Sequence, residues 1–335
     1  YDSNFNQLLA INPSPDYPTN FTSATISGDY VYIGTEDYGL LQTTFFAPDS
    51  FSVVYSDGPL KNNAFSLNAK NNTLWVTYGD YDVYYNAYPL KSSGYSYLRE
   101  EEWNNVAYDT ITDLIGQDVF NLNTISVNPM NPSQVFMSSF FHGLLTLEND
   151  EPSSLFNQTN SSLESLVLAG NPNYIDIRIS GSAFDNQGVL WLLNLKVESP
   201  LKSYNPNTGQ WQSYSFTDII PDVDDELGFS EVVVGDDGTK WVGAATNGLI
   251  AYNENGNRIK NLYDESIHNM PSTYTTALAL DDRSQLWIGT NKGLRVLYNT
   301  GGFFDDDAAT AYQIVILEDG IPKELLEQQH ITDIK

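Results

Sequence analysis

Short apolar stretches of alternating hydrophobicity recur along the whole chain, and each leads into a turn rich in Asp, Asn and Gly. Residues 277–280 (Ala-Leu-Ala-Leu) and 232–234 (Val-Val-Val) show this order, as do residues 65–73 and 125–132. Alternation with a period of two predicts β-strands, and Asp and Gly suit tight turns because they tolerate positive φ or cap their own backbone. The pattern therefore predicts a succession of antiparallel hairpins.

A phrase with an aromatic residue and a glycine follows these turns. Residues 286–294 read Leu-Trp-Ile-Gly-Thr-Asn-Lys-Gly-Leu, and residues 240–249 and 31–40 repeat the phrase with one residue added. With the weaker copies, one aromatic residue marks each unit, at spacings of 43 to 61 residues: Tyr32, Trp75, Phe136, Trp191, Trp241 and Trp287. A large ring in each unit supplies apolar surface that can wedge between adjacent sheets, and the glycine after it lets a neighbouring backbone approach closely.

Units of about 45 residues with three or four antiparallel strands are typical of β-propeller blades. The predicted fold class is all-β, a β-propeller of about seven four-stranded antiparallel blades, six of them complete and one incomplete. Residues 1–335 are expected to form this single domain. A helical fold is disfavoured because no window of 12 residues has a clean 3.6-residue period free of Gly, Pro and Asn. Replacing the marker Trp241 or Trp287 by Ala should cost about 3–5 kcal/mol.

The two ends of the chain bear on how the propeller closes. Residues 331–335 (Ile-Thr-Asp-Ile-Lys) resemble the first strand of another blade, without its aromatic strand. A seventh blade assembled from both ends and a fragment of a larger propeller are both open. Since Tyr1 is neither an initiator Met nor part of a signal peptide, we expect a fragment of a longer chain.

Composition narrows the classes of function. The chain has 43 acidic and 15 basic residues, a net charge of −28, which argues against binding to nucleic acids or directly to anionic lipid surfaces. Aromatic residues make up 13% of the chain, unlike disordered acidic segments. The absence of cysteine excludes disulfides and thiolate metal sites, and the three histidines are far apart in sequence, so no metal or cofactor is predicted. No apolar run approaches the length of about 18 residues that spans a membrane.

The phrase at residues 286–294 resembles the two-component regulator propeller repeat, which is abundant in Bacteroidetes. This family forms the periplasmic sensor half of hybrid regulators that detect glycans, and it also occurs in exported propellers without a kinase. Less regular stretches at residues 128–145, 156–163, 184–211 and 316–322 resemble the PorZ family of the type IX secretion system, in the propeller region before its C-terminal domain.

The resemblance covers most of residues 20–335 and implies a non-catalytic, exported protein at the outer-membrane surface or in the periplasm. A PorZ-like role would place it in the attachment complex with the sortase-like protease, where it would present an anionic lipopolysaccharide. The expected partners are therefore secretion-system proteins or a lipopolysaccharide or other glycan. A glycan-sensing periplasmic propeller of a hybrid two-component regulator is the alternative, and a carbohydrate-active propeller enzyme is a second one.

The densest aromatic run lies between the second marker and residue 103. Exposed Tyr and Trp rings stack on sugars or anchor peptides, so the candidate binding residues are taken from this run together with one histidine: Tyr81, Tyr84, Tyr85, Tyr88, Trp103 and His142. The structural alternative is that residues 82–85, which alternate in polarity, form an ordinary strand within a blade. No catalytic residue is predicted.

Charged residues give weaker indications. The acidic clusters at residues 222–226 and 305–307 lack the spacing of a calcium loop and are expected to be solvated. Residues 236–241 match the core of the sialidase Asp-box, which is a hairpin turn and not a catalytic element. Because an anionic glycan needs a local basic patch, two sets of residues are candidates for one: Lys61, Lys70 and Lys91, or Arg258, Lys260 and Arg283.

Overall fold

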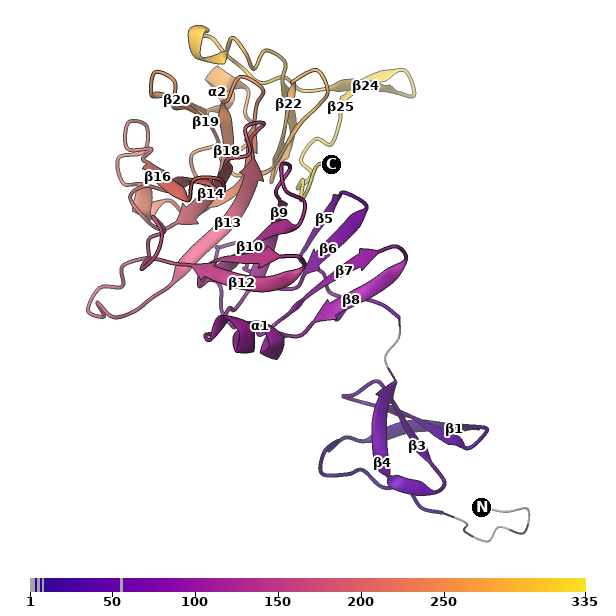
Figure 1. The fold of residues 1–335 in the computed structure, drawn as a ribbon. Helices are drawn as coiled ribbons and strands as arrows, with labels where there is room; N and C mark the ends of the chain where they lie inside the picture. The colour runs from indigo at the N-terminus through magenta and orange to yellow at the C-terminus, as the bar shows by residue number, and fades with distance from the viewer. Residues whose placement is uncertain (1–3, 5–6, 8, 55–56) are drawn as a thin grey trace. The chain divides into compact units, whose positions relative to one another are not determined.

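The computed structural model describes residues 4, 7, 9–54 and 57–335, and the chain divides into two compact units, Tyr1–Gly58 and Pro59–Lys335. Each unit is described by itself. Most of the regular structure consists of antiparallel sheets (Figure 1). The predicted all-β class with four-stranded antiparallel sheets is confirmed, whereas the number of blades and the single-domain organisation stay predictions.

The first unit is a four-stranded meander. Its strands follow one another in the sheet in chain order: β1 (Phe21–Ser27), β2 (Tyr30–Thr35), β3 (Leu40–Thr44) and β4 (Ala47–Val54). Val31, Ile33 and Leu41 are buried on one face of the sheet, and Phe51 packs against them. The first aromatic marker, Tyr32, lies on β2 and is partly exposed.

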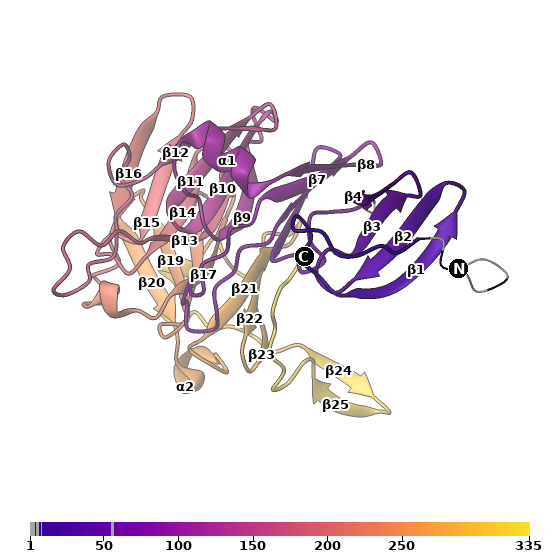
Figure 2. The same cartoon turned by 90° about the horizontal axis from the view of Figure 1, so that it is seen from below.

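The second unit contains five meanders and a final hairpin (Figures 1 and 2). The first two meanders consist of β5 (Ser66–Lys70), β6 (Thr73–Thr77), β7 (Tyr95–Arg99), β8 (Glu102–Val106), β9 (Leu122–Val127), β10 (Gln134–Phe141), β11 (Gly143–Glu148) and β12 (Glu151–Phe156). The next two consist of β13 (Ile177–Phe184), β14 (Leu190–Leu195), β15 (Leu201–Asn205), β16 (Gln210–Tyr214), β17 (Phe229–Val234), β18 (Lys240–Ala244), β19 (Leu249–Asn253) and β20 (Arg258–Leu262). The fifth has β21 (Thr275–Leu280), β22 (Leu286–Thr290) and β23 (Gly293–Leu297), and the hairpin has β24 (Val315–Glu318) and β25 (Ile321–Glu324).

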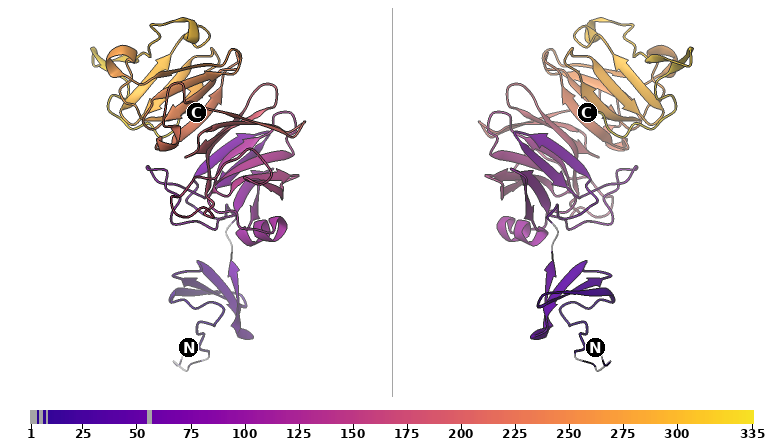
Figure 3. Two further views of the ribbon diagram at one scale, coloured as in Figure 1. Left: turned by 90° about the vertical axis from the view of Figure 1, so that its left-hand side faces the viewer. Right: turned by 90° about the vertical axis from the view of Figure 1, so that its right-hand side faces the viewer.

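The first strands of the five meanders, β5, β9, β13, β17 and β21, lie next to one another in that order. The sheets consequently succeed each other as propeller blades do, and Figure 3 shows this succession from purple to yellow. One irregularity joins two of them, because the end of β10 pairs with the start of β13 at Phe140 and Phe141. In the fifth meander, a bridge between Val296 and Tyr312 takes the place of a fourth strand.

A separate hydrophobic core lies between each pair of neighbouring meanders in this unit. Trp75, Phe136, Trp191 and Trp241 each lie on the second strand of their meander and are at most 3% exposed in one of these four cores. The prediction that the aromatic markers wedge between sheets is therefore confirmed for these four. Trp287 is different, because it lies on β22 but is only partly buried.

Polar side chains on the first strands tie neighbouring meanders together. Asn68 on β5 donates to the carbonyl of Ile125 on β9 (2.8 Å), and Thr124 on β9 donates to the carbonyl of Ser180 on β13 (2.7 Å). Ser230 on β17 likewise donates to the carbonyl of Thr275 on β21 (2.9 Å). Between β13 and β17, the two backbones pack closely at Gly181, where a Cβ would lie 3.2 Å from the Cα of Glu231. These bonds satisfy buried polar groups and fix the stacking of the sheets.

The glycine after the marker has the role expected from the sequence. A Cβ on Gly243 would lie 3.0 Å from the side chain of Thr275, on the first strand of the next meander. A Cβ on Gly289 would lie 2.7 Å from the side chain of Ile331. Ile331 also accepts a hydrogen bond from the side chain of Thr276, as the first strands do from one another. Residue 331 therefore takes the place beside β21 that β21 itself takes beside β17.

Two short helices, α1 (Tyr108–Ile115) and α2 (Glu265–His268), lie in the connections between meanders. The sequence pattern does not predict α1, because a helix of eight residues is too short to show a clear 3.6-residue period. It ends at Gly116, whose φ of 78° is in the left-handed region that glycine adopts readily. In the described part of the chain, neither helix is long and apolar enough to cross a membrane.

Candidate binding face of the propeller

The meanders of the second unit present two different ends. Because successive strands are antiparallel, the connections from the second to the third strand and from one meander to the next share one end, which we call the loop face. The tight turns that join the first to the second strand and the third to the fourth share the other end, which we call the turn face. The long insertion of residues 78–94, between β6 and β7, lies on the loop face.

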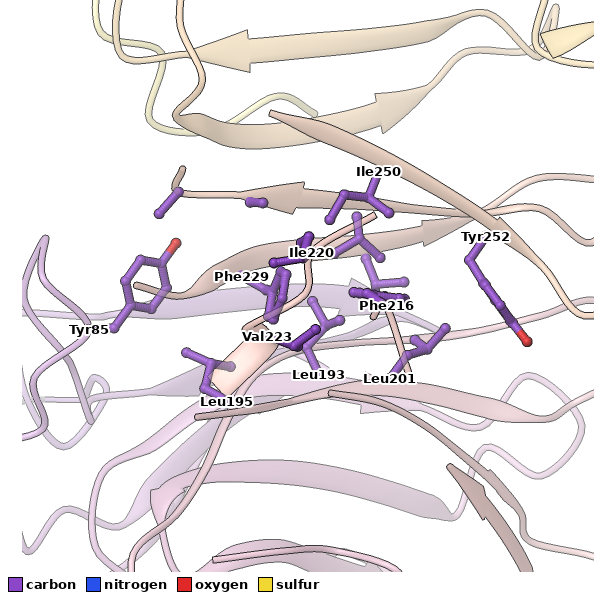
Figure 4. Packing of buried hydrophobic residues seen from close by; sticks show 14 of the residues in the cluster. Tyr85, Leu193, Leu195, Leu201, Phe216, Ile220, Val223, Phe229, Ile250 and Tyr252 are labelled. Atoms are coloured by element: carbon purple, nitrogen blue, oxygen red, sulfur yellow. The ribbon is translucent and has the colours of Figure 1, made fainter. Parts of the chain in front are cut away.

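Four of the six candidate binding residues lie in this insertion, of which Tyr85 is buried and Tyr81 is half-buried. Tyr81 stacks on Phe140 at 4.2 Å and on Tyr85 at 5.3 Å between ring centroids. Tyr85 is 2% exposed and belongs to the core between the third and fourth meanders (Figure 4). A Cβ on Gly228 would lie within 2.6 Å of its ring, so glycine is required there. Burial raises the pKa of Tyr85 well above its ordinary value. These two tyrosines are structural anchors.

The other two tyrosines of the insertion face solvent. Tyr84 is 70% exposed and Tyr88 is 49% exposed. Tyr84 lies in a turn at residues 82–86, and Tyr88 follows it. Asp82 accepts hydrogen bonds there from the backbone N–H groups of Tyr84 (2.8 Å) and Asn86 (3.0 Å). Residues 82–85 form no strand, so the structural alternative of an ordinary blade strand is wrong. The insertion packs Tyr81 and Tyr85 against the protein and exposes Tyr84 and Tyr88.

A buried ion pair holds the insertion in place. Arg178 on β13 pairs with Asp176 (2.6 Å), whose side chain is fully buried, and donates to the backbone carbonyl of Tyr85 (2.9 Å). Asp176 also accepts from the hydroxyl of Tyr174 (3.2 Å), and that hydroxyl lies 3.0 Å from the hydroxyl of Tyr88. Burial and these hydrogen bonds raise the pKa of Tyr174, so the phenol stays neutral. The network joins the insertion to the connection between β12 and β13, which contains Tyr174 and Asp176.

His142 belongs to the same face but is engaged within the protein. Its Nδ1 accepts a hydrogen bond from the backbone N–H of Phe120 (3.2 Å), and its ring lies against Phe141 and Phe120. Burial lowers the pKa of His142, which keeps the imidazole neutral near pH 7. Trp103 is not brought to this site. It lies at the start of β8, next to the turn at residues 100–101, and therefore near the turn face.

Sequence reasoning missed the residues that anchor the insertion. Tyr174 and Asp176 lie in the connection before β13 and Arg178 lies on β13, at least 80 residues along the chain from the insertion. One signal was present, because the charged residues Asp176 and Arg178 flank the first residue of β13. A charged pair at the start of a buried strand requires a partner or a structural role.

Neither predicted basic patch forms. Lys61 donates to Ser93 (2.8 Å) and Lys91 pairs with Asp80 on the loop face, whereas Lys70 lies at the opposite end of β5. In the second set, Lys260 donates to backbone carbonyls of Phe303 and Asp306. Arg258 lies over the ring of Phe304 and 4.0 Å from Asp305. Lys61, Lys91, Lys260 and Arg258 thus serve internal contacts, whereas Lys70 lines the cavities of the opposite face and Arg283 is exposed.

The turn face contains two adjoining cavities of about 320 and 380 Å³, between the first meanders of the unit. Both are lined by Lys70 and Val127. In the first, Arg99 forms a bidentate pair with Asp150 (2.7 and 2.8 Å), so its charge is neutralised.

The acidic clusters do not assemble a metal site. In the cluster at 222–226, Glu226 is buried and accepts hydrogen bonds from the backbone and side chain of Thr246. Among the residues that the structure describes, no three His, Cys, Asp or Glu side chains are placed to hold a metal ion.

Comparisons with known proteins fit this architecture. No family model matches the chain, and no curated protein matches its sequence. Among solved structures, PorZ, an essential bacterial surface component of the type IX secretion system of Porphyromonas gingivalis, superposes with a TM-score of 0.77 and 20% identity. The match covers 92% of this chain and 42% of PorZ. The chain is similar in fold to PorZ.

The extracellular domain of a regulator from B. thetaiotaomicron is also similar, in two solved structures. In one, described as that of a one-component system, the TM-score is 0.52 with 16% identity, over 85% of this chain and 33% of that domain. In the other, described as that of a hybrid two-component system, the TM-score is 0.51 with 17% identity, over 82% and 32%. The resemblance to PorZ and to two-component regulator propellers inferred from the repeat is thereby confirmed at the level of the fold. The chain spans less than half the length of PorZ and about a third of the regulator domain.

Proposed function

We propose that this protein is a non-catalytic, exported β-propeller that serves as an interaction platform at the bacterial surface, in a role like that of PorZ. The observation that carries the proposal is the structural likeness to PorZ over 92% of the chain. The loop face supports it, since exposed tyrosines there are held by a buried network rather than arranged around a reactive group. Large rigid surfaces of this kind favour binding to macromolecules.

The partner proposed for this platform is a protein of the secretion machinery. An anionic lipopolysaccharide, the other partner expected from the resemblance, needs a concentration of positive charge. The net charge is −28, and four of the six cations that were candidates for a basic patch, Lys61, Lys91, Arg258 and Lys260, contact Ser, Asp or backbone groups of the chain. Like charges repel across a docking surface, so the charge distribution favours a protein partner.

Deletion of the gene in the bacterium that encodes it tests this function. We expect secreted cargo to lose its attachment to the cell surface, as measured by cell fractionation and immunoblotting, and reintroduction of the gene to restore it. Unchanged attachment of cargo would contradict the proposal.

A sensor domain of a two-component regulator is the second candidate, favoured by the likeness to the regulator domain from B. thetaiotaomicron, whose two structures give TM-scores of 0.52 and 0.51. It makes a different prediction for the same deletion strain. Attachment of cargo would be normal, and the transcriptional response to a glycan would be lost. Transcript profiling of the deletion strain with and without added polysaccharides separates the two roles.

A further inference from the structure

The exposed part of the insertion continues into a neighbouring connection. Val83, Tyr84 and Tyr88 are between 49% and 70% exposed, and Ile175, next to Tyr174, is 46% exposed. Tyr88 and Tyr174 meet through their hydroxyls at 3.0 Å, and both rings pack edge-on against Phe141. We call these five residues, Val83, Tyr84, Tyr88, Tyr174 and Ile175, the tyrosine patch.

The tyrosine patch is fixed before any partner arrives. Tyr81 and Tyr85, on either side of Val83 and Tyr84, are inserted into the protein, and Arg178 holds the carbonyl of Tyr85 at 2.9 Å. The hydroxyl of Tyr274 donates to the carbonyl of Val83 at 3.1 Å, from a connection 191 residues away. Because the backbone of the insertion is held on both sides, binding costs little ordering entropy.

The surroundings of the patch are strongly acidic. The loop-face connections contain no arginine. Of their lysines, Lys91 is engaged with Asp80 and Lys196 with the carbonyl of Glu226. Lys61 donates to Ser93, and Lys292, between β22 and β23, is exposed. In contrast, several exposed carboxylates of the same connections form no ion pair in the described part of the chain: Asp82, Asp113, Asp118, Asp222, Asp224 and Asp225. A field of unpaired negative charge around aromatic rings attracts cations and steers their approach.

We propose that the tyrosine patch docks an extended polypeptide segment rich in lysine and arginine, contributed by the protein partner. The inference rests on the proposed function as an interaction platform and specifies the chemistry of its partner. Arginine or lysine side chains would lie on the faces of Tyr84 and Tyr88, where the ring quadrupole favours a cation, and would pair with carboxylates such as Asp82. The apolar side chains of Val83 and Ile175 would contact the aliphatic stems of the same residues.

A labelled synthetic peptide tests the proposal with the full chain. The probe is a segment of about ten residues that alternates arginine or lysine with glycine and serine, and its control carries glutamate at the basic positions. We expect the basic probe to bind in fluorescence anisotropy and the acidic control not to bind. The double variant Tyr84→Ala/Tyr88→Ala should weaken binding about tenfold, since two cation–π contacts are lost.

A matched variant separates docking from general attraction to an acidic protein. Tyr298 is 50% exposed, nearly the same as Tyr88, but it follows β23 on the turn face. Tyr298→Ala should leave binding of the basic probe unchanged. Circular dichroism of all variants should coincide, because the replaced rings are exposed. Equal affinity of the parent, the double variant and Tyr298→Ala would overturn the proposal, as would equal binding of the acidic control.

The double variant also distinguishes failure of this inference from failure of the proposed function. If deletion of the gene abolishes attachment of cargo and the double variant restores it fully, the docking inference is wrong and the platform function stands. If the double variant fails to restore attachment although it folds, both are supported. If deletion has no effect on cargo while the double variant loses peptide binding, the proposed function is wrong and the tyrosine patch still binds basic segments.

Discussion

The two faces of the second unit satisfy their polar groups in different ways. On the turn face, one aspartate serves each of two turns. Asp185 accepts from the N–H groups of Gln187 and Val189 and from the indole N–H of Trp191 (all 2.9 Å), and Asp281 repeats this arrangement with Trp287. On the loop face, the insertion is held by Arg178 and Tyr274, which are 93 and 191 residues from their acceptors. Local bonds hold these two turns of the turn face, whereas long-range bonds hold the insertion on the loop face.

This difference explains why the turn face repeats and the loop face does not. A turn satisfied by its own residues can be copied with its blade, and its sequence stays recognisable. A loop that depends on partners from distant connections is individual, and such loops commonly carry function. The comparison predicts that substitutions on the turn face act on stability, whereas those on exposed loop residues act on binding.

The largest expected effect is a loss of stability when an aromatic marker is removed from a core near the turn face. Trp241 is fully buried, so Trp241→Ala should lower the free energy of unfolding by about 3–5 kcal/mol. Trp287 is only partly buried, and Trp287→Ala should cost less, about 1–2 kcal/mol. Urea unfolding followed by tyrosine and tryptophan fluorescence measures both. The loss of stability expected for Trp287→Ala is therefore smaller than the repeat alone predicts. Equal losses in free energy of unfolding for the two variants would show that both rings are buried to the same extent.

The next effect tests the anchored half of the loop face. Gly228→Ala would place a Cβ within 2.6 Å of the buried ring of Tyr85, so the insertion must shift. We expect the free energy of unfolding to fall by about 1–3 kcal/mol, as overpacking in a core does. Gly301→Ala is the control, because a Cβ there meets no atom within 4 Å, and its effect should stay within about 0.5 kcal/mol. If the two variants unfold alike, Tyr85 is not a rigid anchor.

The repeat made the fold predictable, because its aromatic markers and turns act locally. Trp75, Phe136, Trp191 and Trp241 all lie between sheets as their spacing implied. The site was only half predictable. Composition pointed to the tyrosine run, but no local pattern distinguishes Tyr85, which inserts beside Gly228, from Tyr84, which faces water. That distinction depends on Arg178, Tyr274 and Gly228, whose positions follow from the assembled propeller.

A third prediction concerns a carboxyl on a first strand, between the two faces. Glu231 on β17 accepts from the backbone N–H of Leu278 (2.9 Å), and burial raises its pKa in the folded state. The unfolded chain therefore releases this proton at lower pH, and the contribution of Glu231 to stability falls as the pH rises from about 4 toward its folded pKa. Glu231→Gln keeps an acceptor for Leu278 without the charge.

We expect Glu231→Gln to raise the free energy of unfolding at pH 7, and the difference from the parent to disappear near pH 3. Urea unfolding at a series of pH values measures this. A variant that is less stable than the parent at pH 7 would show that the ionised carboxylate contributes to folding. That result would mean that the folded protein stabilises the charged form of Glu231 through a favourable partner.

The smallest effect concerns the turn before Trp241, which lacks an aspartate at the position that it has in the turns before Trp191 and Trp287. Trp241 has no hydrogen-bond partner for its indole N–H, because Gly235 stands six residues before it, where Asp185 and Asp281 precede Trp191 and Trp287. A Cβ on Gly235 would lie 3.5 Å from this nitrogen and 3.0 Å from Oδ1 of Asp237, which must shift slightly in any variant with a side chain here. Gly235→Asn should therefore supply the missing acceptor without adding a charge beside Asp237, and should raise the free energy of unfolding by about 0.5–1 kcal/mol.

Gly235→Ala is the matched control, since it adds the Cβ and the backbone restriction without an acceptor. A gain for Asn above that for Ala in urea unfolding would show that one local acceptor per turn stabilises this face, and equal gains would assign the effect to the backbone.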